Sequence, residues 1–238
     1  MGQDKKALVS GAVIRRLPRY YRFFESLLDN DITRISSKEI SEAMGFTASQ
    51  IRQDFNNFGS FGQQGYGYNV SLLYGETKRI LGLDKVYNMI LIGLGNYGQA
   101  LVNYPNFKKR GYNFVAAFDN NPDIVGKIVA GLNVADVCTM EDFLAKNSVD
   151  IAVLTLPDHA VEETAQRLID SGIKAIWNFS SVEIAKRSGT IVEDVRLTDS
   201  LMILSYKMKE EVILEEIPEG MPGELTEELS EELSEEIT

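Results

Sequence analysis

The feature that most restricts the fold of this chain is a glycine-rich turn near its middle, Gly93-Leu-Gly-Asn-Tyr-Gly98. Four apolar residues, Met89–Ile92, come directly before the turn, and a segment compatible with a helix follows it as far as Val102. This pattern is typical of a buried parallel strand that turns into a helix. The three glycines allow a tight turn, close approach of the backbone to a pyrophosphate, and close packing of the helix on the strand. The free N–H groups at the helix start can then receive phosphates.

A second predicted strand, Phe114–Asp119, ends in a carboxylate 21 residues after Gly98. A carboxylate at this distance accepts hydrogen bonds from the 2′-hydroxyl of an adenosine ribose and repels a 2′-phosphate. It therefore favours NAD(H) over NADP(H). The glycine pattern also occurs in plain strand–turn–helix units, but the acid and the apolar residues on both sides favour a dinucleotide site.

Two more buried strands are predicted at residues 149–154 and 173–177, with a helix between them from about residue 159 to 169. A short helix at 141–146 is expected to be capped by Thr139. Alternating strands and helices indicate a doubly wound parallel sheet, in which ligands bind beyond the carboxyl ends of the strands. The residues predicted to bind the cofactor at those ends are Gly93, Leu94, Gly95, Asn96, Tyr97, Gly98, Asp119, Thr155, Leu156, Pro157, Asn178 and Phe179.

The composition excludes several classes of protein. The chain has 44% hydrophobic residues but no apolar run near 18 residues, which argues against a membrane protein. Its first residues lack the apolar segment of a secretory signal, so a cytoplasmic location is expected. A single cysteine, Cys138, and a single histidine, His159, leave no basis for an internal disulfide or a zinc site. Cys138 is expected to be small and buried, and His159 to be a surface or structural residue.

The net charge of −11 does not describe the body of the protein. The first 85 residues hold 12 Lys and Arg against 9 Asp and Glu, whereas residues 210–238 hold 12 glutamates and no Lys or Arg. The acidic balance therefore belongs almost entirely to the tail, and it does not exclude a nucleic-acid partner for the mildly basic front part. Disorder is the default expectation for the tail.

A helix is predicted near the start of the chain, because apolar residues recur there at steps of three and four. The residues expected to face a core are Ile14, Leu17, Tyr21, Phe24 and Leu28. Pro18 suits a first helical turn, so a break or kink is expected at that position. Four arginines crowd the segment and form either a solvated face or phosphate contacts, namely Arg15, Arg16, Arg19 and Arg22. The segment that follows favours phosphate contact, and Arg15 and Arg16 are predicted to bind DNA.

Two short capped helices are predicted next. Ser36 with Glu39 matches a capping box, Gly45 suits the end of the first helix, and Thr47 with Gln50 repeats the capping pattern. Ala48, Ile51 and Phe55 are expected on the inner face of the second helix. Such a pair occurs as plain packing, but it also forms a helix-turn-helix, whose second helix enters the major groove of DNA. Arginine pairs with guanine and glutamine with adenine. The outward residues predicted to contact DNA are Ser49, Gln50, Arg52 and Gln53.

A glycine- and aromatic-rich stretch, residues 58–70, follows the second helix and predicts a strand pair of the wing type. It contains no Lys or Arg, so contact with DNA is expected through backbone N–H groups and through Gln63 and Gln64. Ser71 is expected to cap a connecting helix that ends near residue 81. The predicted domains are a winged helix-turn-helix at 1–84, a Rossmann-type domain at 85–197, a C-terminal helix at 198–209 and the acidic tail at 210–238.

A winged helix-turn-helix joined to an NAD-type Rossmann domain resembles the Rex family of bacterial redox-sensing repressors. The resemblance covers roughly residues 10–209 and is specific as a set. The stretches that carry it are Arg16-Leu-Pro-Arg-Tyr-Tyr-Arg22, Ile51-Arg-Gln-Asp-Phe55, Phe58–Gly62, Gly65-Tyr-Gly-Tyr68, Gly93–Gly98, Leu154-Thr-Leu-Pro157 and Asn178-Phe179.

The resemblance implies a homodimer that binds a palindromic operator when NAD⁺ dominates and releases it when NADH rises. It implies that the C-terminal helix at 198–209 swaps onto the partner subunit, and that Tyr104 lies near the nicotinamide. It also implies that Arg16 pairs with an aspartate just before the swapped helix. This chain has Arg196 at that position, with Asp194 and Asp199 beside it. The acidic tail and Gln63-Gln64 also depart from the family pattern.

The sequence allows two alternatives to a repressor that binds NAD(H). An NAD-dependent dehydrogenase with an accessory domain would need an acid–base residue, and only His159 is a candidate. A related regulator could bind coenzyme A or another ligand in the same crevice. No catalytic set is evident in the sequence, so a regulator that binds NADH and NAD⁺ is favoured over an enzyme.

Overall fold

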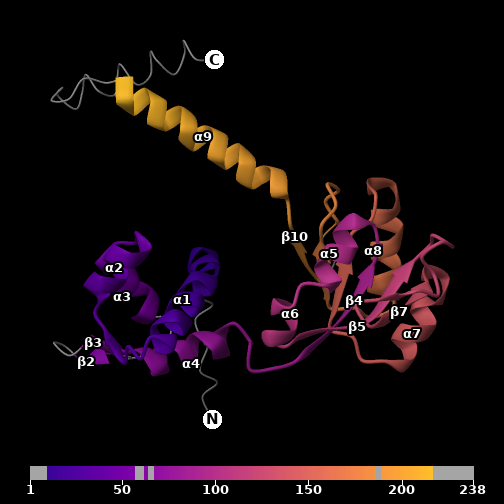
Figure 1. Ribbon diagram of the computed structural model, residues 1–238, viewed down its shortest axis with the longest axis horizontal. Coiled ribbons are helices and arrows are strands. Elements are labelled where there is room, and N and C mark those ends of the chain that lie inside the picture. The colour runs from indigo at the N-terminus through magenta and orange to yellow at the C-terminus, as the bar shows by residue number, and fades with distance from the viewer. Residues whose placement is uncertain (1–9, 57–61, 64–66, 186–188, 217–238) are drawn as a thin grey trace. The chain divides into compact units, whose positions relative to one another are not determined.

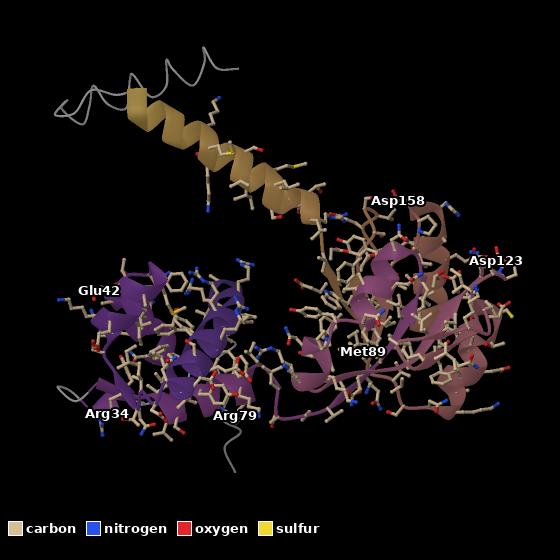
Figure 2. The ribbon with its side chains drawn as sticks, in the orientation of Figure 1. Arg34, Glu42, Arg79, Met89, Asp123 and Asp158 are labelled. Atoms are coloured by element: carbon tan, nitrogen blue, oxygen red, sulfur yellow. The ribbon has the colours of Figure 1, made fainter. Side chains whose placement is uncertain are left out.

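The computed structural model describes residues 10–56, 62–63, 67–185 and 189–216. The chain forms two compact units (Figure 1). The first contains the chain up to Val86 together with Pro105–Tyr112, and the second contains Tyr87–Tyr104 and the chain from Asn113 onward. Labelled charged side chains such as Arg34 and Glu42 lie on the outside of the first unit (Figure 2).

The first unit is built from helices with a small sheet. In chain order its elements are α1 (Gly11–Asp29), β1 (Arg34–Ile35), α2 (Ser37–Met44), α3 (Ala48–Asn56), β2 (Gly62–Gln63), β3 (Gly67–Asn69), α4 (Val70–Ile80) and α6 (Asn106–Lys109). The sheet order is β1-β3-β2, and both pairings are antiparallel. With α2 and α3 this is a winged helix-turn-helix, as the sequence predicted. The connection between β2 and β3 lies outside the described residues.

Helix α1 differs from the prediction in two respects. It runs without a break through Pro18, and its inward face is shifted, because Val13 and Tyr20 are buried while Ile14 is half exposed. A proline removes one helical hydrogen bond, but buried side chains lie on both sides of it. Leu17, Tyr20 and Phe24 are almost fully buried, and this burial holds the helix together across the proline.

The turn between α2 and α3 confirms the predicted caps. Ser36 and Glu39 form both bonds of a capping box, with the Ser36 amide donating to Glu39 at 2.7 Å and the Glu39 amide donating to Ser36 at 3.1 Å. Gly45 ends α2 with a φ of 72°, which favours glycine. The Thr47 hydroxyl accepts from the Gln50 amide at 3.1 Å and starts α3. Ile51 and Phe55 face the core, as predicted.

Helix α4 begins two residues earlier than predicted. Asn69 is its N-cap, since the Leu72 amide donates to the Asn69 side chain at 3.0 Å. Ser71 therefore lies inside the helix, and its prediction as the cap is wrong. Val70 is fully buried as the first helical residue, and this fixes the start of the helix at the end of strand β3.

The segment at Pro105–Tyr112 packs on the first unit through Arg110. Its guanidinium donates to Glu25 at 2.9 Å and lies 5.0 Å from the centre of the Tyr21 ring. This ion pair and cation–π contact attach α6 to α1, although the sequence around α6 lies between elements of the second unit. The prediction treated residues 85–197 as one continuous domain, whereas the structure places Pro105–Tyr112 in the first unit.

The second unit is a seven-stranded sheet with helices. Its elements are β4 (Tyr87–Ile92), α5 (Asn96–Val102), β5 (Tyr112–Asp119), β6 (Ile128–Val129), β7 (Leu132–Asp136), α7 (Met140–Lys146), β8 (Ile151–Leu154), α8 (Val161–Asp170), β9 (Ala175–Asn178), β10 (Ile191–Asp194) and α9 (Leu197–Glu216). The strand order is β10-β9-β8-β4-β5-β7-β6. β6 pairs antiparallel to β7, whereas β10, β9, β8 and β4 run parallel. The strand order therefore turns in opposite directions on the two sides of β4, as in a doubly wound sheet.

The predicted strands β4, β5, β8 and β9 are present, but β6, β7 and β10 were missed. These three strands are short and carry few buried residues: among Leu132–Asp136, for example, only Val134 is buried. A hydrophobic run of the usual length is absent at each of them, so periodicity could not detect them.

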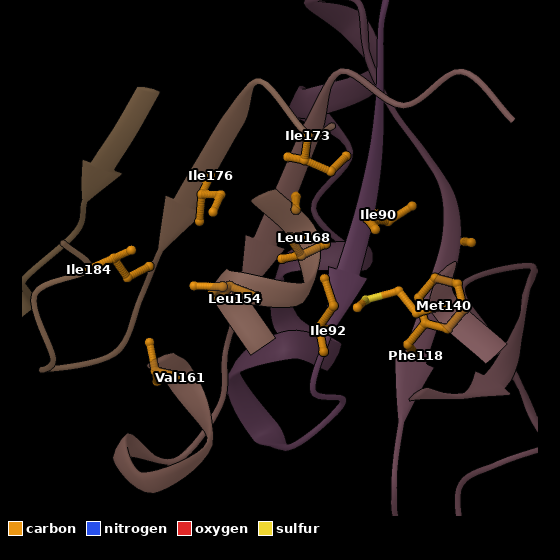
Figure 3. Packing of buried hydrophobic residues seen from close by; sticks show 13 residues of the cluster. Ile90, Ile92, Phe118, Met140, Leu154, Val161, Leu168, Ile173, Ile176 and Ile184 are labelled. Carbon is orange, nitrogen blue, oxygen red and sulfur yellow. The ribbon is translucent and has the colours of Figure 1, made fainter. Parts of the chain in front are cut away.

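Apolar side chains cover one face of the sheet, where α7 and α8 pack (Figure 3). Ile90 and Ile92 of β4 meet Leu168 of α8 and Met140 of α7 there. The opposite side chains of β4, Met89 and Leu91, are also buried. A central strand that is buried on both faces explains the unbroken apolar run before the glycine turn.

The loop before α7 corrects two predictions. Thr139 occupies the N-cap position of α7, as predicted, but its side chain makes no capping hydrogen bond there; Asp136 caps the preceding 3-10 turn at residues 137–139, because its carboxylate accepts from the Cys138 amide at 2.8 Å. The Thr139 hydroxyl instead donates to the Asp136 carbonyl at 2.7 Å. Cys138 is exposed rather than buried, since this short turn lies on the surface between β7 and α7. Hydrogen bonding to Asp136 raises the pKa of the Cys138 thiol.

Helix α9 extends from Leu197 to Glu216, beyond the predicted end at 209. Up to residue 209, where its side chains are described, its large apolar residues are exposed within the single chain, including Leu201, Met202 and Leu204. The acidic tail after residue 216 lies outside the described residues, so its expected disorder stays a prediction. Among the described helices, none is long and apolar enough to cross a membrane.

Candidate functional site

A cavity of about 340 Å³ opens at the carboxyl ends of β4, β5 and β8. This is the point where the strand order reverses around β4, the usual ligand position in such sheets. The lining residues are Ile92, Gly93, Gly95, Asp119, Asn120, Val137, Thr155, Leu156, Pro157, Ala160, Glu163, Thr164 and Arg167. Of the predicted cofactor residues, this set includes Gly93, Gly95, Asp119, Thr155, Leu156 and Pro157. It does not include Leu94, Asn96, Tyr97, Gly98, Tyr104, Asn178 and Phe179.

The three glycines of the turn have different reasons for being glycine. A side chain at Gly93, where φ is 95°, would lie 2.6 Å from the Thr155 carbonyl oxygen, and one at Gly98 would collide with the Gly93 carbonyl. The fold itself therefore requires these two glycines. A side chain at Gly95 would meet nothing within 4 Å. The open space at Gly95, beside the cavity, suits a group that is not part of the chain.

The Asp119 carboxylate anchors the glycine turn as well as facing the cavity. It accepts from the Leu94 amide at 2.5 Å and from the Asn121 amide at 2.8 Å, and it is almost fully buried. Each carboxylate oxygen keeps a further lone pair for another donor, such as a ribose hydroxyl. The sequence pattern identified Asp119 but not this structural role, since backbone contacts leave no trace in residue spacing.

Thr155 holds the turn from the neighbouring strand. Its amide donates to the Ile92 carbonyl at 3.0 Å, and its hydroxyl donates to the Gly93 carbonyl at 2.6 Å. Leu94, by contrast, is completely buried, so its side chain belongs to the core and only its backbone faces the turn. The turn is thus fixed from β5 through Asp119 and from β8 through Thr155.

Aromatic side chains gather beside the turn. Tyr97 of α5 and Phe179 after β9 have ring centres 5.7 Å apart, and the Trp177 ring lies 4.6 Å from Phe179. Tyr97 is 44% exposed, so its ring is accessible from solvent. Asn96 and Tyr104 are exposed as well. Tyr104 follows the C-terminal end of α5, away from the glycine turn that precedes the same helix.

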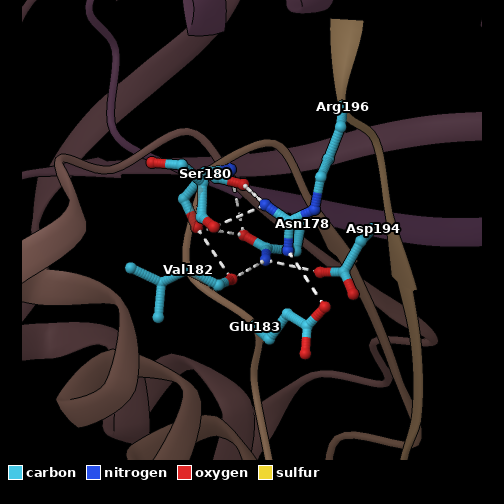
Figure 4. A network of polar contacts seen from close by, with 7 residues as sticks. Asn178, Ser180, Val182, Glu183, Asp194 and Arg196 are labelled. Atoms are coloured by element: carbon cyan, nitrogen blue, oxygen red, sulfur yellow. Dashed lines mark hydrogen bonds and ion pairs between the residues drawn. The ribbon is translucent and has the colours of Figure 1, made fainter. Parts of the chain in front are cut away.

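Asn178 is the centre of a buried polar network (Figure 4). Its amide nitrogen donates to Asp194 at 2.7 Å and to the Val182 carbonyl at 2.8 Å. Its amide oxygen accepts from the backbone and the hydroxyl of Ser180. All four hydrogen-bond positions of the side chain are therefore used within the protein. The network joins the loop after β9 to the end of β10, directly before α9.

Arg196 completes this link. Its guanidinium donates to the carbonyls of Ser180, at 3.3 Å, and Ser181, at 2.5 Å, and it lies 3.9 Å from Glu183. One terminal nitrogen of Arg196 is buried without a hydrogen-bond partner in the described part of the chain. Arg196 thus ties the residue before α9 to the loop beyond the crevice strand β9.

Neither the histidine that a dehydrogenase would need nor a metal-binding cluster is found at the cavity among the described residues. His159 is exposed in the short 3-10 turn before α8 and does not line the cavity. No group of three or more His, Cys, Asp or Glu side chains in that part of the chain converges to hold a metal ion. Arg167 and Glu163 of α8, which line the cavity, were missed because α8 was interpreted only as a packing helix.

Helix α3 presents three of the predicted DNA-contacting side chains to solvent, since Ser49, Arg52 and Gln53 are exposed, while Gln50 is half-buried. Arg52 donates to the Ser37 hydroxyl of α2 at 3.2 Å, which orients its guanidinium along the outer surface of the helix pair. Arg15 of α1 is exposed. Gln63 belongs to β2, whereas Gln64 lies outside the described residues.

Arg16 has a different environment from Arg15. Its guanidinium makes a bidentate ion pair with Asp54 of α3, with both donor–acceptor distances at 2.7 Å. The Tyr20 hydroxyl donates to the same carboxylate at 2.9 Å. Asp54 is 2% exposed, so this carboxylate is buried in the helix-turn-helix core. Burial raises the pKa of Tyr20, and the hydrogen bond to Asp54 raises the pKa of Arg16.

Arg19 also holds α1 to the helix-turn-helix. It donates to the Met44 carbonyl at 3.0 Å, and its guanidinium lies 4.5 Å from the centre of the Phe46 ring. The arginine-rich segment is therefore neither a uniform solvated face nor a uniform phosphate surface. Arg16 is partly buried in its ion pair with Asp54, whereas Arg15, Arg19 and Arg22 are exposed, and Arg19 differs from the other two exposed arginines by its contacts with Met44 and Phe46.

Comparison with known proteins shows the family to which the chain belongs. Residues 8–56 match a family described as the N-terminus of putative DNA-binding proteins, and residues 84–182 match one described as the CoA binding domain. A redox-sensing transcriptional repressor Rex from Thermoanaerobacter sp. (strain X514) is 54% identical over 90% of this chain and 96% of its own length. The chain belongs to the Rex family of redox-sensing transcriptional repressors.

Other Rex proteins are similar to this chain over most of its length. The Rex repressor of Clostridioides difficile (strain 630) is 54% identical over 85% of this chain and 96% of its own. A solved Rex-family repressor called RSP superposes with a TM-score of 0.82 at 52% identity, covering 88% of this chain and 98% of that one. RSP has also been solved with β-NAD⁺ and operator DNA, and with β-NADH, again with TM-scores of 0.82.

This membership removes the dehydrogenase alternative, because Rex proteins are transcriptional repressors and not enzymes. The family resemblance implied that Arg16 pairs with an aspartate just before the C-terminal helix. In this Rex chain, Arg16 is held by Asp54 and Arg196 by the carbonyls of residues 180–181. Arg16 and Arg196 are both positively charged and do not form an ion pair with each other. Each is held by contacts inside its own unit.

The Arg16–Asp54 pair leads to a prediction about stability. Replacing Asp54 with asparagine removes the buried negative charge that holds Arg16 and Tyr20. We expect the first unit to lose about 3 kcal/mol in free energy of unfolding, as when one partner of a buried pair is removed. Urea unfolding followed by circular dichroism measures the loss.

Arg15→Ala is the matched control, because Arg15 is an exposed arginine on the same helix. Its free energy of unfolding should stay within about 0.5 kcal/mol of that of the wild type. Equal stability of Asp54→Asn and Arg15→Ala would show that the ion pair does not hold α1 to α3.

Proposed function

We propose that this Rex chain represses transcription by binding operator DNA and releases the operator when NADH occupies its second unit. The observation that carries the proposal is the likeness, across both units, to RSP structures solved with NAD⁺ and operator DNA and with NADH. The structure adds a glycine turn with open space at Gly95 and an acid at Asp119 that can accept from a ribose.

The cavity residues fit a dinucleotide. Gly95 leaves room for the backbone to approach a pyrophosphate, and Asp119 keeps lone pairs for the adenosine ribose. The nicotinamide, when bound, supplies a ring whose charge differs between its oxidised and reduced forms. We assign the ring to the aromatic side of the turn, near Tyr97 and Phe179, whose rings lie 5.7 Å apart.

Coenzyme A is a less suitable occupant, although part of the chain matches a CoA-binding family. Coenzyme A carries a phosphate on its adenosine ribose. A carboxylate at Asp119 opposes a phosphate next to the ribose, since like charges in a partly dry site repel each other. NAD(H) has hydroxyl groups at this ribose, and the carboxylate can accept from them.

DNA recognition is assigned to α3 and the wing. The second helix of a helix-turn-helix lies in the major groove, and Ser49, Arg52 and Gln53 of α3 are exposed. Arg52 can pair with guanine O6 and N7, and Gln50 or Gln53 with adenine. Arg15 is exposed for phosphate contact. We assign Arg16 to positioning α3, because Asp54 already occupies its guanidinium.

A homodimer accounts for the exposed apolar residues of α9. Leu201, Met202, Ile203, Leu204, Tyr206 and Met208 are each more than half exposed in the single chain. Contiguous apolar surface of this kind marks an interaction site, and a second copy of the same chain matches the family resemblance. A dimer also suits a palindromic operator, since half-sites mirror the symmetry of the protein.

The Asn178 network offers a route from the cofactor to the dimer. It connects the loop after β9, where Phe179 contacts Tyr97, to Asp194 and Arg196 directly before α9. A ligand can shift the protein between two states only if it binds them with different affinity. A coupling of about 1–3 kcal/mol gives roughly 5–150-fold regulation of operator affinity. We place the protein in the cytoplasm, together with its DNA.

The central prediction concerns release of DNA. In a fluorescence-anisotropy titration of operator DNA, NADH should weaken binding by roughly 5–150-fold, the range of ordinary allosteric coupling. NAD⁺ should reverse the effect, and NADPH should have little effect. An unchanged operator affinity in the presence of NADH would overturn the proposed function.

Gly95→Ala is the matched variant for this titration. Its added methyl group meets nothing within 4 Å in the protein, so folding and cofactor-free operator binding should be retained. The response to NADH should be lost, because the methyl group enters the space assigned to the pyrophosphate. A parallel titration with coenzyme A tests the alternative ligand.

A second prediction concerns operator reading by α3. Arg52→Ala should weaken binding by about 1–3 kcal/mol and relax discrimination at one base pair, because a bidentate contact to guanine is lost. Binding is measured against operators that vary at each position. Arg15→Ala, at the exposed arginine assigned to phosphate contact, should weaken all operators alike and reduce the salt slope by about 1. A uniform loss for Arg52→Ala would contradict base reading.

A third prediction concerns assembly. Sedimentation should give a mass of twice the 26.6 kDa chain for the wild type. The double variant Leu201→Glu, Leu204→Glu should sediment as a monomer, because charges replace apolar contacts at the interface. Lys207→Glu, an exposed polar position on the same helix, should remain a dimer. Persistence of the dimer in the double variant would exclude α9 from the interface.

A further inference from the structure

One basic side chain lines the cavity at the carboxyl ends of the strands. Arg167 of α8 shares the cavity wall with the acids Asp119 and Glu163, and the other described lining residues are uncharged. Arg167 is therefore the one cation among them that could receive an additional phosphate on a ligand. Whether it can do so depends on what already occupies its guanidinium.

Glu141 of α7 occupies the guanidinium of Arg167. The two side chains form a bidentate ion pair with donor–acceptor distances of 2.5 and 2.8 Å. The hydrogen bond between them lowers the pKa of Glu141 and raises the pKa of Arg167. A planar guanidinium with a carboxylate on its fork is close to neutral as a unit.

A third contact holds Arg167 in place independently of Glu141. The same guanidinium donates to the carbonyl of Val137 at 3.0 Å, and Val137 is itself part of the cavity wall. If Glu141 lost its charge, the arginine would therefore still be anchored beside the cavity. Its positive charge would then face the ligand without a counter-ion.

The ligand group at issue is a phosphate on the adenosine ribose. In dinucleotide sites an acid at the end of the second strand accepts from the ribose hydroxyls, and a nearby arginine is what accommodates a 2′-phosphate. Here the acid, Asp119, and the arginine, Arg167, lie in the same cavity. A 2′-phosphate brings nearly two negative charges, which an arginine that is already neutralised does not balance.

We propose that Glu141 is a specificity-determining residue: by pairing with Arg167 it neutralises the one cation among the described cavity-lining residues that could receive a 2′-phosphate, and so excludes NADP(H). This inference rests on the proposed binding of NAD(H) and adds a second determinant to Asp119. The two acids act differently. Asp119 faces the ribose itself, whereas Glu141 acts through Arg167 from outside the cavity lining.

Glu141→Gln tests the proposal, with NADPH and NADH binding measured by isothermal titration calorimetry on the full chain. A freed arginine that gains a charge-assisted contact should tighten NADPH binding by about tenfold. NADH affinity should stay within about threefold, since NADH lacks the phosphate. Thermal unfolding checks that the variant is folded.

Two further variants distinguish this role from a general loss of negative charge. Glu163→Gln removes another acid of the cavity wall that has no hydrogen bond to Arg167 among those described, and it should tighten NADPH binding less than Glu141→Gln. The double variant Glu141→Gln, Arg167→Ala should lose the gain entirely. An equal gain in Glu163→Gln, or a gain that survives without Arg167, would overturn the proposal.

Arg167→Ala alone gives an independent test in a chain whose Glu141 is intact. NADPH affinity should not fall, because the paired arginine contributes nothing to phosphate binding. A clear fall would show that Arg167 already receives the phosphate and would refute the proposal. A wild type that fails to bind NADH would instead refute the proposed function, so the two failures are distinguishable.

Discussion

The contact between the Asp119 carboxylate and the Leu94 amide, at 2.5 Å, holds the functional part of the molecule together. It joins the end of β5 to the turn after β4, and Thr155 joins the same turn to the end of β8. These three strand ends surround the cavity at the reversal of strand order. A backbone fixed from both sides is preorganised, so a ligand need not order it on binding.

The glycine turn separates the requirements of folding from those of binding. Gly93 and Gly98 are required by contacts inside the chain, whereas Gly95 has open space where a side chain would be. The sequence pattern treats the three positions alike, and only packing distinguishes them. Gly95 combines this open space with a place in the cavity wall, and the two together indicate a position where the backbone approaches a ligand.

Strongly periodic segments were predictable from the sequence and contacts between distant elements were not. The apolar run before Gly93 and the caps at Ser36 and Gly45 were correct, because each depends on neighbouring residues. Strand β10 and the burial of Asp54 were missed, because each depends on partners far along the chain. Asp54 was counted only as part of a family motif, although it is the residue that fixes Arg16.

Charge pairing within the chain determines which basic side chains remain available to ligands. Arg16 is neutralised by Asp54, and Arg167 by Glu141, while Arg15 and Arg52 are exposed and bear no carboxylate partner among the described contacts. A count of arginines therefore overstates the positive surface of both units. What distinguishes a phosphate-binding arginine from a structural one is the carboxylate beside it, since a carboxylate paired with one edge of the guanidinium offsets its positive charge. In this chain the same pairing rule keeps α3 in position in one unit and keeps the cavity wall neutral at Arg167 in the other.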